Sequence, residues 1–263
     1  MSGLIARLQQ ALNSGVVLRE EPFGRLSEVD PETALRLREF LPVVALHRSG
    51  NELTRIDTAV RAGVLVETDV QVHDGRFVAE HEHRAGPLSY DWQRRLWRLG
   101  DPPFSLEPVL AEAKRLDAGL LLDLKLTTDW VPALIGLVRR YGLIENAAFT
   151  GEWRPLDAIH DYGVTTTAGF NYGGMNRGWK LERFLREQPR MKRPGVSLHK
   201  KLASRENIER LHGTGAQVLV YVVSDGAEAL ELLRHGADGL VTNNVALAEV
   251  WRAPKTQLSS TGP

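Results

Sequence analysis

Acidic residues alternate with apolar ones in two segments whose pattern is typical of β-strands. The segment VLVETDV contains Glu67 and Asp69, and the segment GLLLDLKL contains Asp123 and Lys125. Because successive side chains of a strand point to opposite faces, each of these pairs lies on one face of its strand. Three carboxylates at one height repel one another without a counter-charge, and their oxygens suit a hard cation. The pattern therefore predicts a site for one divalent cation, Mg²⁺ or Ca²⁺.

Ion pairing is a simpler interpretation of the same acidic residues. Carboxylates at strand ends are often partly exposed, and they pair with basic side chains such as Arg48 and Lys125. Charged residues at the ends of two neighbouring strands favour a functional site over unrelated ion pairs. Both interpretations remain open at the level of the sequence.

Two histidines are placed to act beside these acids. His47 follows the apolar run VVAL and shares a face with alternate residues of that run, while His81 lies in the segment DGRFVAEHEH. Imidazoles titrate near neutral pH, so two of them can serve as general base and general acid. His83 and His199 are ambiguous, since the two lysines of SLHKK beside His199 either meet an anion or face solvent. We expect the remaining histidines to be structural: His73, His160, His212 and His235.

Eight apolar runs from residue 43 onward predict the strands that position these groups. They are VVAL (43–46), VLVETDV (64–70), GLLLDLKL (119–126), NAAF (146–149), VTTTAGF (164–170), PGVSL (194–198), QVLVYVV (217–223) and DGLVT (238–242). Helical patterns separate most of them, at 52–61, 106–115, 130–141, 181–187, 205–211, 227–234 and 245–251. Strands that alternate with helices imply a parallel sheet, and eight such units favour a closed (β/α)₈ TIM barrel, whose sites lie at the carboxyl ends of the strands.

The chain divides into three parts on this interpretation. Residues 1–41 form an N-terminal helical extension that caps the barrel or plugs its bottom, 42–252 form the barrel, and 253–263 form a flexible tail. Asp30 and Pro31 suit the N-cap and first position of a helix that runs to Phe40.

Composition narrows the possible functions. The 263 residues include 33 basic and 33 acidic side chains and no cysteine. Charge balance gives no general attraction to nucleic acid, and the lack of cysteine excludes disulfides, thiolate metal sites and cysteine nucleophiles. Neither a signal peptide nor an apolar run long enough to span a membrane is evident, so we expect a cytoplasmic protein. The sequence does not indicate an oligomeric state.

A long excursion at 71–117 separates the second and third predicted strands. It contains DGRF, a hairpin-turn signature, and a stretch rich in tryptophan and arginine, YDWQRRLWRLGDPPF. Long loops at this end of a barrel shape substrate sites. Trp92 and Trp97 either contact lipid, fold over the site or pack as ordinary core, and we favour the core.

These residues together resemble a known family. HRSGNELTRIDTAVRAGVLVETDVQVHDGRFVAEHEH resembles the first catalytic block of the glycerophosphodiester phosphodiesterase superfamily. Later segments resemble the family's subsequent blocks in the same order: PFSLEPVLAEA, LLLDLKL and QVLVYVVSDGAEALELLRHGADGLVTNN. The resemblance extends from about residue 43 to residue 250, and it rests on all of these segments occurring in the family's order.

Spacing resembles one branch of that superfamily more than the others. The segment between His47 and Glu67 is short. The sphingomyelinase D and phospholipase D toxin-like branch has segments similar to IDTAVRAGVLVETDV, DLK and VTNN. That branch also has an aspartate where Asp123 stands. Three positions depart from the superfamily pattern: Ser49, Glu82 and Tyr221. The tail motif of the toxin-like branch is not evident in RAPKTQLSSTGP.

The resemblance implies a role for each site residue. Glu67, Asp69 and Asp123 would hold the cation, and His47 and His81 would move protons. The phosphate- and substrate-binding residues would be Arg48, Lys125, His199 and Tyr221, of which Tyr221 stands where a tryptophan is common.

Three functions follow from these assignments. The first is metal-dependent cleavage of a small phosphodiester, such as a glycerophosphodiester or a lysophospholipid. The second uses the same site as a lyase that forms a cyclic phosphate by intramolecular attack. The third is a noncatalytic barrel that binds a phosphorylated ligand.

Overall fold

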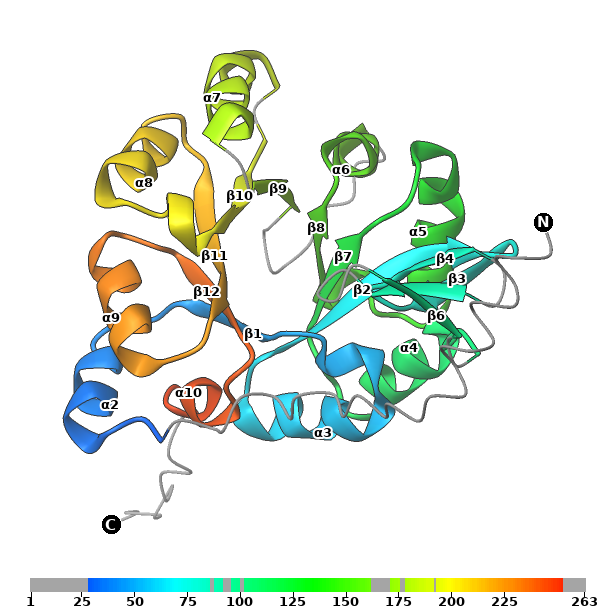
Figure 1. The fold of residues 1–263 in the computed structure, drawn as a ribbon, viewed down its shortest axis with the longest axis horizontal. Coiled ribbons are helices and arrows are strands. Elements are labelled where there is room, and N and C mark those ends of the chain that lie inside the picture. Colours follow the sequence, from blue (N-terminus) through cyan, green and yellow to red (C-terminus); the bar gives the residue numbers. More distant parts are fainter. Residues whose placement is uncertain are drawn as a thin grey trace, which may run out of the picture.

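A closed barrel of eight parallel strands forms the centre of the molecule in the computed structural model, which describes residues 28–85, 88–91, 96–99, 102–161, 171–175, 178–191 and 193–252 (Figure 1). The strands are β1 (Val43–Leu46), β2 (Leu65–His73), β7 (Leu120–Leu124), β8 (Ala147–Gly151), β9 (Asn171–Met175), β10 (Gly195–His199), β11 (Gln217–Val223) and β12 (Gly239–Thr242). They are hydrogen-bonded in sequence order, and β1 pairs with both β12 and β2, which closes the ring. The predicted (β/α)₈ architecture is confirmed.

Helices surround the barrel (Figure 1). They are α2 (Pro31–Leu37), α3 (Leu53–Ala62), α4 (Leu106–Arg115), α5 (Val131–Arg140), α6 (Trp153–Asp161), α7 (Gly178–Met191), α8 (Arg205–His212), α9 (Gly226–Arg234) and α10 (Val245–Glu249). Several begin at a polar cap, since the side chains of Ser105, Ser204 and Asp225 accept hydrogen bonds from backbone N–H groups in the first turns of α4, α8 and α9. Short 3₁₀ turns complete the connections: η1 (Ser49–Asn51), η2 (Thr128–Trp130), η3 (Ile144–Asn146) and η4 (Lys200–Leu202).

Successive side chains of each strand point alternately outward to the helices and inward to the barrel interior, which gives the molecule an outer and an inner core. Outward side chains pack against the helices in two large apolar clusters. A smaller cluster fills the barrel interior and consists of Ala45, Leu121, Ala148, Leu219 and Val241. The next inward position on each strand, two residues later, therefore faces the mouth of the barrel. On β1, β7 and β11 that position holds a residue predicted for the site.

Two elements differ from the sequence prediction. The fifth strand is β9, whereas the predicted run at 164–170 lies outside the described residues. Helix α6 was not among the predicted helical stretches. Its Pro155 falls in the first turn, where a helix needs no backbone N–H from it. Helix α7 also extends past the predicted end and contains Pro189.

The excursion after β2 forms additional strands. The predicted DGRF turn is confirmed, because Asp74 and Gly75 have positive φ angles of 46° and 75° and join β2 to the antiparallel strand β3 (Arg76–Ala79). A separate three-stranded sheet follows, with strands β4 (His83–Ala85), β5 (Leu88–Asp91) and β6 (Leu96–Leu99). Trp97 contacts Tyr90 and is 44% exposed, so the core interpretation is wrong for Trp97. Trp92 lies outside the described residues.

Helix α2 begins as the sequence predicts. Asp30 Oδ1 accepts a hydrogen bond of 2.9 Å from the Thr33 N–H, and Pro31 occupies the first position. The helix packs against the outer side of α9 rather than over either end of the barrel (Figure 1). Gly226 allows this close approach, because an added Cβ would lie 2.9 Å from a Val29 methyl and 3.0 Å from a Thr33 methyl.

The described residues leave the predicted three-part division untested at both ends. Residues 1–27 and 253–263, which carry most of the predicted extension and the whole tail, lie outside them. Among the described helices, none combines the length and apolar character needed to cross a bilayer.

Candidate active site

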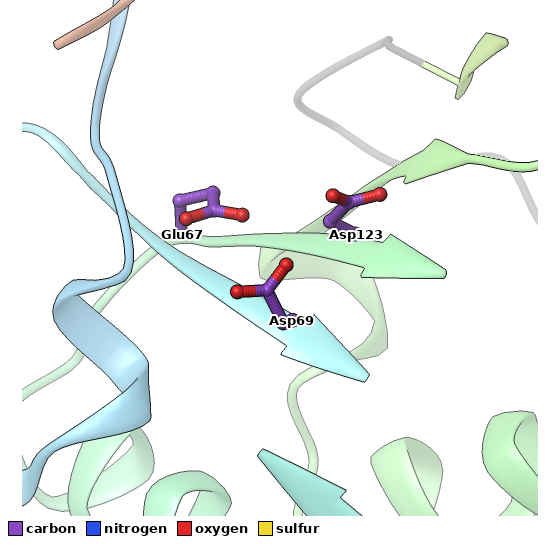
Figure 2. A group of neighbouring side chains, drawn as sticks. All are labelled: Glu67, Asp69 and Asp123. Atoms are coloured by element: carbon purple, nitrogen blue, oxygen red, sulfur yellow. The ribbon is translucent and has the colours of Figure 1, made fainter. Parts of the chain in front are cut away.

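Three carboxylates from two adjacent strands meet at the mouth of the barrel. Glu67 and Asp69 project from β2 and Asp123 projects from β7, where Asp69 and Asp123 are paired in register. Figure 2 shows the three groups turned toward a common space. One oxygen from each lies within 4.8 Å of those of the other two, and Glu67 and Asp69 are only 3% and 1% exposed. This arrangement can hold a metal ion.

The electrostatics of the cluster favour a bound cation. Burial raises the pKa of the Glu67 carboxyl above its ordinary value. Burial, together with the negative charges of Glu67 and Glu152, raises the pKa of the Asp123 carboxyl to about 7. A cation placed among the three would offset this repulsion and keep the carboxylates ionised. Oxygen ligands of this kind suit Mg²⁺ or Ca²⁺.

Basic side chains also pair with the cluster, as the simpler interpretation of the sequence expected. Lys125 Nζ lies 3.1 Å from Asp123 Oδ2 and contacts Asp69 Oδ1 directly. Arg48 Nε lies 3.7 Å from Asp69 Oδ2. Burial lowers the pKa of the Lys125 ammonium to about 8. The three carboxylates therefore lie together as a metal site would require, and two of them also form ion pairs with basic side chains.

The turn after β1 binds two of the carboxylates. Arg48 adopts a left-handed conformation with φ of 53°, and its backbone N–H donates to Glu67 Oε2. Asn51 makes two bonds to Asp69: its Nδ2 donates to Asp69 Oδ2 at 2.8 Å, and its Oδ1 accepts from the Asp69 N–H at 3.1 Å. Sequence reasoning missed Asn51, for which the one available indication was an amide side chain four residues after His47.

Close packing fixes this turn against β2. A Cβ on Gly50 would lie 1.7 Å from Thr68 Oγ1, so no larger residue fits without a shift. Ser49, one of the three positions noted above as departing from the superfamily pattern, is buried and donates from its hydroxyl to the Leu46 carbonyl at 2.7 Å. The departure at Ser49 is therefore accommodated inside the turn.

The environment of His47 keeps its imidazole neutral. Burial lowers the pKa of His47 well below its usual value, and the positive charges of Arg48, His81 and Lys125 lower it further. Its backbone N–H donates to the Thr242 carbonyl at 2.8 Å, which ties the residue to β12. A neutral imidazole has a free ring nitrogen that can accept a proton.

A side chain on β2 holds the segment that carries His81. Gln71 Nε2 donates to the carbonyls of Glu80 and Glu82, at 2.7 and 3.1 Å, on either side of His81. Gln71 is 9% exposed, so these bonds are shielded from water. Sequence reasoning missed Gln71, because nothing in the pattern DVQVHDG indicates which backbone its amide meets.

His199 is the last residue of β10, and it is paired in register with Tyr221 of β11, two residues before that strand ends. Their rings meet edge to face with centroids 5.5 Å apart. Burial and the negative charges of Asp123 and Glu152 raise the pKa of the Tyr221 hydroxyl to about 12, so this residue is close to the carboxylates. His199 Nδ1 accepts a hydrogen bond of 3.2 Å from the Lys201 N–H and joins the site through Tyr221.

Glu152 is a further acidic residue at the mouth that sequence reasoning missed. It directly follows Gly151, whose φ is 112° and whose added Cβ would lie 2.6 Å from Asp123 Oδ1. The backbone at the end of β8 therefore runs against the carboxylate of Asp123. An acidic residue immediately after the strand in the sequence FTGE was the available indication.

The barrel and its mouth define a class: a (β/α)₈ protein with clustered carboxylates and histidines at the carboxyl ends of its strands. Solved structures with this fold include a protein from Silicibacter pomeroyi described as a glycerophosphoryl diester phosphodiesterase (TM-score 0.66, 16% identity, 84% of this chain and 97% of that one). A glycerophosphodiester phosphodiesterase from Parabacteroides distasonis is similar (TM-score 0.62, 17% identity, 79% and 95%). An Oleispira antarctica phosphodiesterase in complex with the product sn-glycerol-3-phosphate is similar too (TM-score 0.61, 17% identity, 82% and 99%).

These similarities concern the fold. The resemblance found in the sequence is thereby confirmed at the level of architecture, over most of this chain and nearly all of each solved structure. No family model matches the sequence, and no curated protein is similar to it in sequence.

Proposed function

We propose that this protein is a metal-dependent phosphodiesterase that cleaves a small phosphodiester, such as a glycerophosphodiester or a lysophospholipid. The observation that carries the proposal is the cluster of Glu67, Asp69 and Asp123, with carboxylate oxygens within 4.8 Å of one another. The cluster lies in a fold shared with glycerophosphodiester phosphodiesterases.

The three carboxylates would hold one divalent cation, Mg²⁺ or Ca²⁺. When bound, such an ion supplies Lewis-acid stabilisation of charge on a phosphoryl oxygen. The chain supports the ligands from behind, because Asn51 fixes Asp69 and the Arg48 N–H fixes Glu67. Such outer contacts orient ligands and tune their affinity.

The two histidines would carry the protons. Neutral His47 accepts the proton of the attacking hydroxyl as the new oxygen–phosphorus bond forms. His81 donates a proton to the leaving oxygen as its bond to phosphorus breaks, so no free alkoxide is released. Arg48 and Lys125 supply positive charge near the nonbridging oxygens. Tyr221 and His199 would form the opposite wall.

The attacking hydroxyl belongs either to water or to the substrate. Attack by water gives a linear phosphomonoester, and attack by a neighbouring hydroxyl of the substrate gives a cyclic phosphate. The same pair of histidines serves both routes, so the product distinguishes hydrolase from lyase.

Time-resolved phosphorus NMR on the purified protein tests the proposal. Glycerophosphocholine, glycerophosphoethanolamine and lysophosphatidylcholine are each incubated with protein and Mg²⁺, with EDTA as the control. We expect a phosphomonoester or cyclic phosphate resonance that EDTA abolishes. Absence of both products from all three substrates would reject the proposal, and tight binding of a diester without turnover would favour a noncatalytic barrel.

A further inference from the structure

A cavity of about 360 Å³ lies at the same end of the barrel as the carboxylate cluster. Its walls come from the segment after β7, the start of α6 and the first two turns of α7, all of which follow the carboxyl ends of strands. The lining residues are Leu126, Thr127, Thr128, Glu152, Trp153, Arg154, Pro155, Lys180 and Arg183. The volume suits a headgroup of a few heavy atoms.

Two residues of the lining connect the cavity to the proposed reaction centre. Leu126 directly follows Lys125, whose ammonium pairs with Asp123. On the other wall, Glu152 carries a charge that reaches Asp123 and contributes to the rise in the pKa of that carboxyl. A group attached to a phosphate at the carboxylate cluster would therefore extend into this cavity.

The cavity has an excess of positive charge. Three basic side chains, Arg154, Lys180 and Arg183, line it with one acidic side chain, Glu152. The positive charge of Arg183 is offset by Glu187, because Arg183 Nε donates to Glu187 Oε1 at 2.7 Å. Arg154 and Lys180 form no ion pair with any other residue within the described ranges, and Lys180 is half-buried. Two cations, Arg154 and Lys180, thus stand against one anion, Glu152, which leaves the lining with a net positive charge.

The aromatic wall cannot serve a cationic headgroup. Recognition of a quaternary ammonium needs an open aromatic face. The guanidinium groups of Arg183 and Arg193 already lie over the Trp153 ring, 5.4 and 5.0 Å from its centroid. Arg193 is fixed there by two bonds to Asp157, of 2.9 and 3.0 Å. Trp153 therefore presents a surface already covered by cations.

We propose that this cavity binds an anionic group, a carboxylate or a second phosphate, on the alcohol esterified to the scissile phosphate. The inference rests on the proposed function and specifies its substrate class: a phosphodiester with an additional negative charge. Lys180 and Arg154 would donate charge-assisted hydrogen bonds to that group. Thr127 and Thr128 also line the cavity, and their hydroxyls can serve as neutral donors.

A matched pair of substrates tests the inference. Glycerophosphoserine and glycerophosphoethanolamine differ by one carboxylate. We measure kcat/KM for both with the wild-type protein in Mg²⁺, and Kd for both by calorimetry on His47→Ala, which prevents turnover during the titration. The expected preference for glycerophosphoserine is about tenfold in each quantity, the scale of one hydrogen bond to a charged group.

Paired variants separate the cavity from general electrostatics. Lys180→Gln combined with Arg154→Gln should reduce the preference to about twofold or less. Arg186→Gln combined with Arg190→Gln removes the same number of charges from exposed positions of α7 and should keep the preference. Melting temperatures report whether each variant is folded.

The outcomes distinguish the two proposals. Equal values for the two diesters, or a preference that survives loss of Lys180 and Arg154, would overturn the anion site. Cleavage of neither diester, with the binding preference intact, would reject the phosphodiesterase proposal and keep the cavity as a site for anionic diesters. Absence of both binding and cleavage would overturn both.

Discussion

Gln71 shows how a residue without chemistry of its own supports a proton-transfer group. Its amide bridges the carbonyls of Glu80 and Glu82, and His81 lies between them. A positioned imidazole transfers protons well only when its backbone is fixed. Gln71 is therefore a positioning residue in the proposed mechanism.

Loss of the histidines and of Gln71 should have related effects. His47→Ala and His81→Ala should each lower kcat by about 10²- to 10⁴-fold, the usual loss for general acid–base groups. Gln71→Ala should lower kcat by a smaller factor, and the double variant with His81→Ala should be no slower than His81→Ala alone. Steady-state kinetics of the two single variants and the double variant test this expectation. Wild-type kcat in either histidine variant, or additive losses in the double variant, would contradict these roles.

Asn51 is predicted to act through the metal site. Its two bonds fix both the carboxylate and the backbone of Asp69. Asn51→Ala should weaken Mg²⁺ binding by about 10- to 100-fold, as for other residues that orient metal ligands. Calorimetric titration of Mg²⁺ checks this, with the exposed Asn146→Ala as the matched control. An unchanged Kd would remove Asn51 from the site.

Asp123 should make stability depend on pH when metal is removed. Because its pKa is raised from an ordinary 3.8 to about 7 in the folded protein, the folded state binds more protons there than the unfolded state. Stability from this group therefore falls as pH rises through that interval. In EDTA, the free energy of unfolding of Asp123→Asn relative to wild type should increase by roughly 1 kcal/mol from pH 6 to pH 8. Chemical denaturation measures it, and a constant difference would contradict the assignment.

At the scale of elements, the turn between β1 and α3 determines how the carboxylates are held. It brings the Arg48 N–H to Glu67 and the Asn51 amide to Asp69, and Gly50 lets it lie directly on β2. A side chain at Gly50 would push the turn away from the strand. Gly50 therefore links the packing of this turn to the proposed metal site.

Gly50→Ala should affect both properties. The added Cβ would lie 1.7 Å from Thr68 Oγ1 and 2.9 Å from Thr68 Cβ, so the turn must shift. Overpacking of this kind costs about 1–3 kcal/mol. We expect a lower Tm and weaker Mg²⁺ binding, with partial recovery of both in Gly50→Ala combined with Thr68→Ala. Thermal unfolding and calorimetry check this; an unshifted Tm would show that the contact is easily relieved.

At the scale of the whole molecule, strand periodicity was the part that sequence reasoning could predict. Alternation along a strand is local, so Glu67, Asp69 and Asp123 could be placed on inward faces before any fold was known. Asn51, Gln71 and Glu152 could not, because their roles depend on which backbone or charge a turn brings near. Strand β9 has the sequence NYGGM, which has little apolar character to indicate a strand.

A metal ion bound at the mouth should stabilise the whole barrel, because its ligands come from both β2 and β7. Anything that binds the folded state alone raises stability by mass action. Saturating Mg²⁺ should raise the Tm of the wild-type protein by several degrees. Asp123→Asn should show little of this shift. Scanning calorimetry measures both, and equal shifts would argue against Asp123 as a ligand.

The ladder between β1 and β2 gives the site a second role. Two residue pairs, Ala45 with Leu65 and Leu46 with Val66, join these strands, the shortest ladder among the described strands of the ring. The bonds from the turn after β1 to Glu67 and Asp69 cross the same junction. Glu67 and Asp69 of the proposed metal site therefore also help to hold the barrel closed between β1 and β2. Natural selection that keeps these residues for activity would also preserve the contact between β1 and β2.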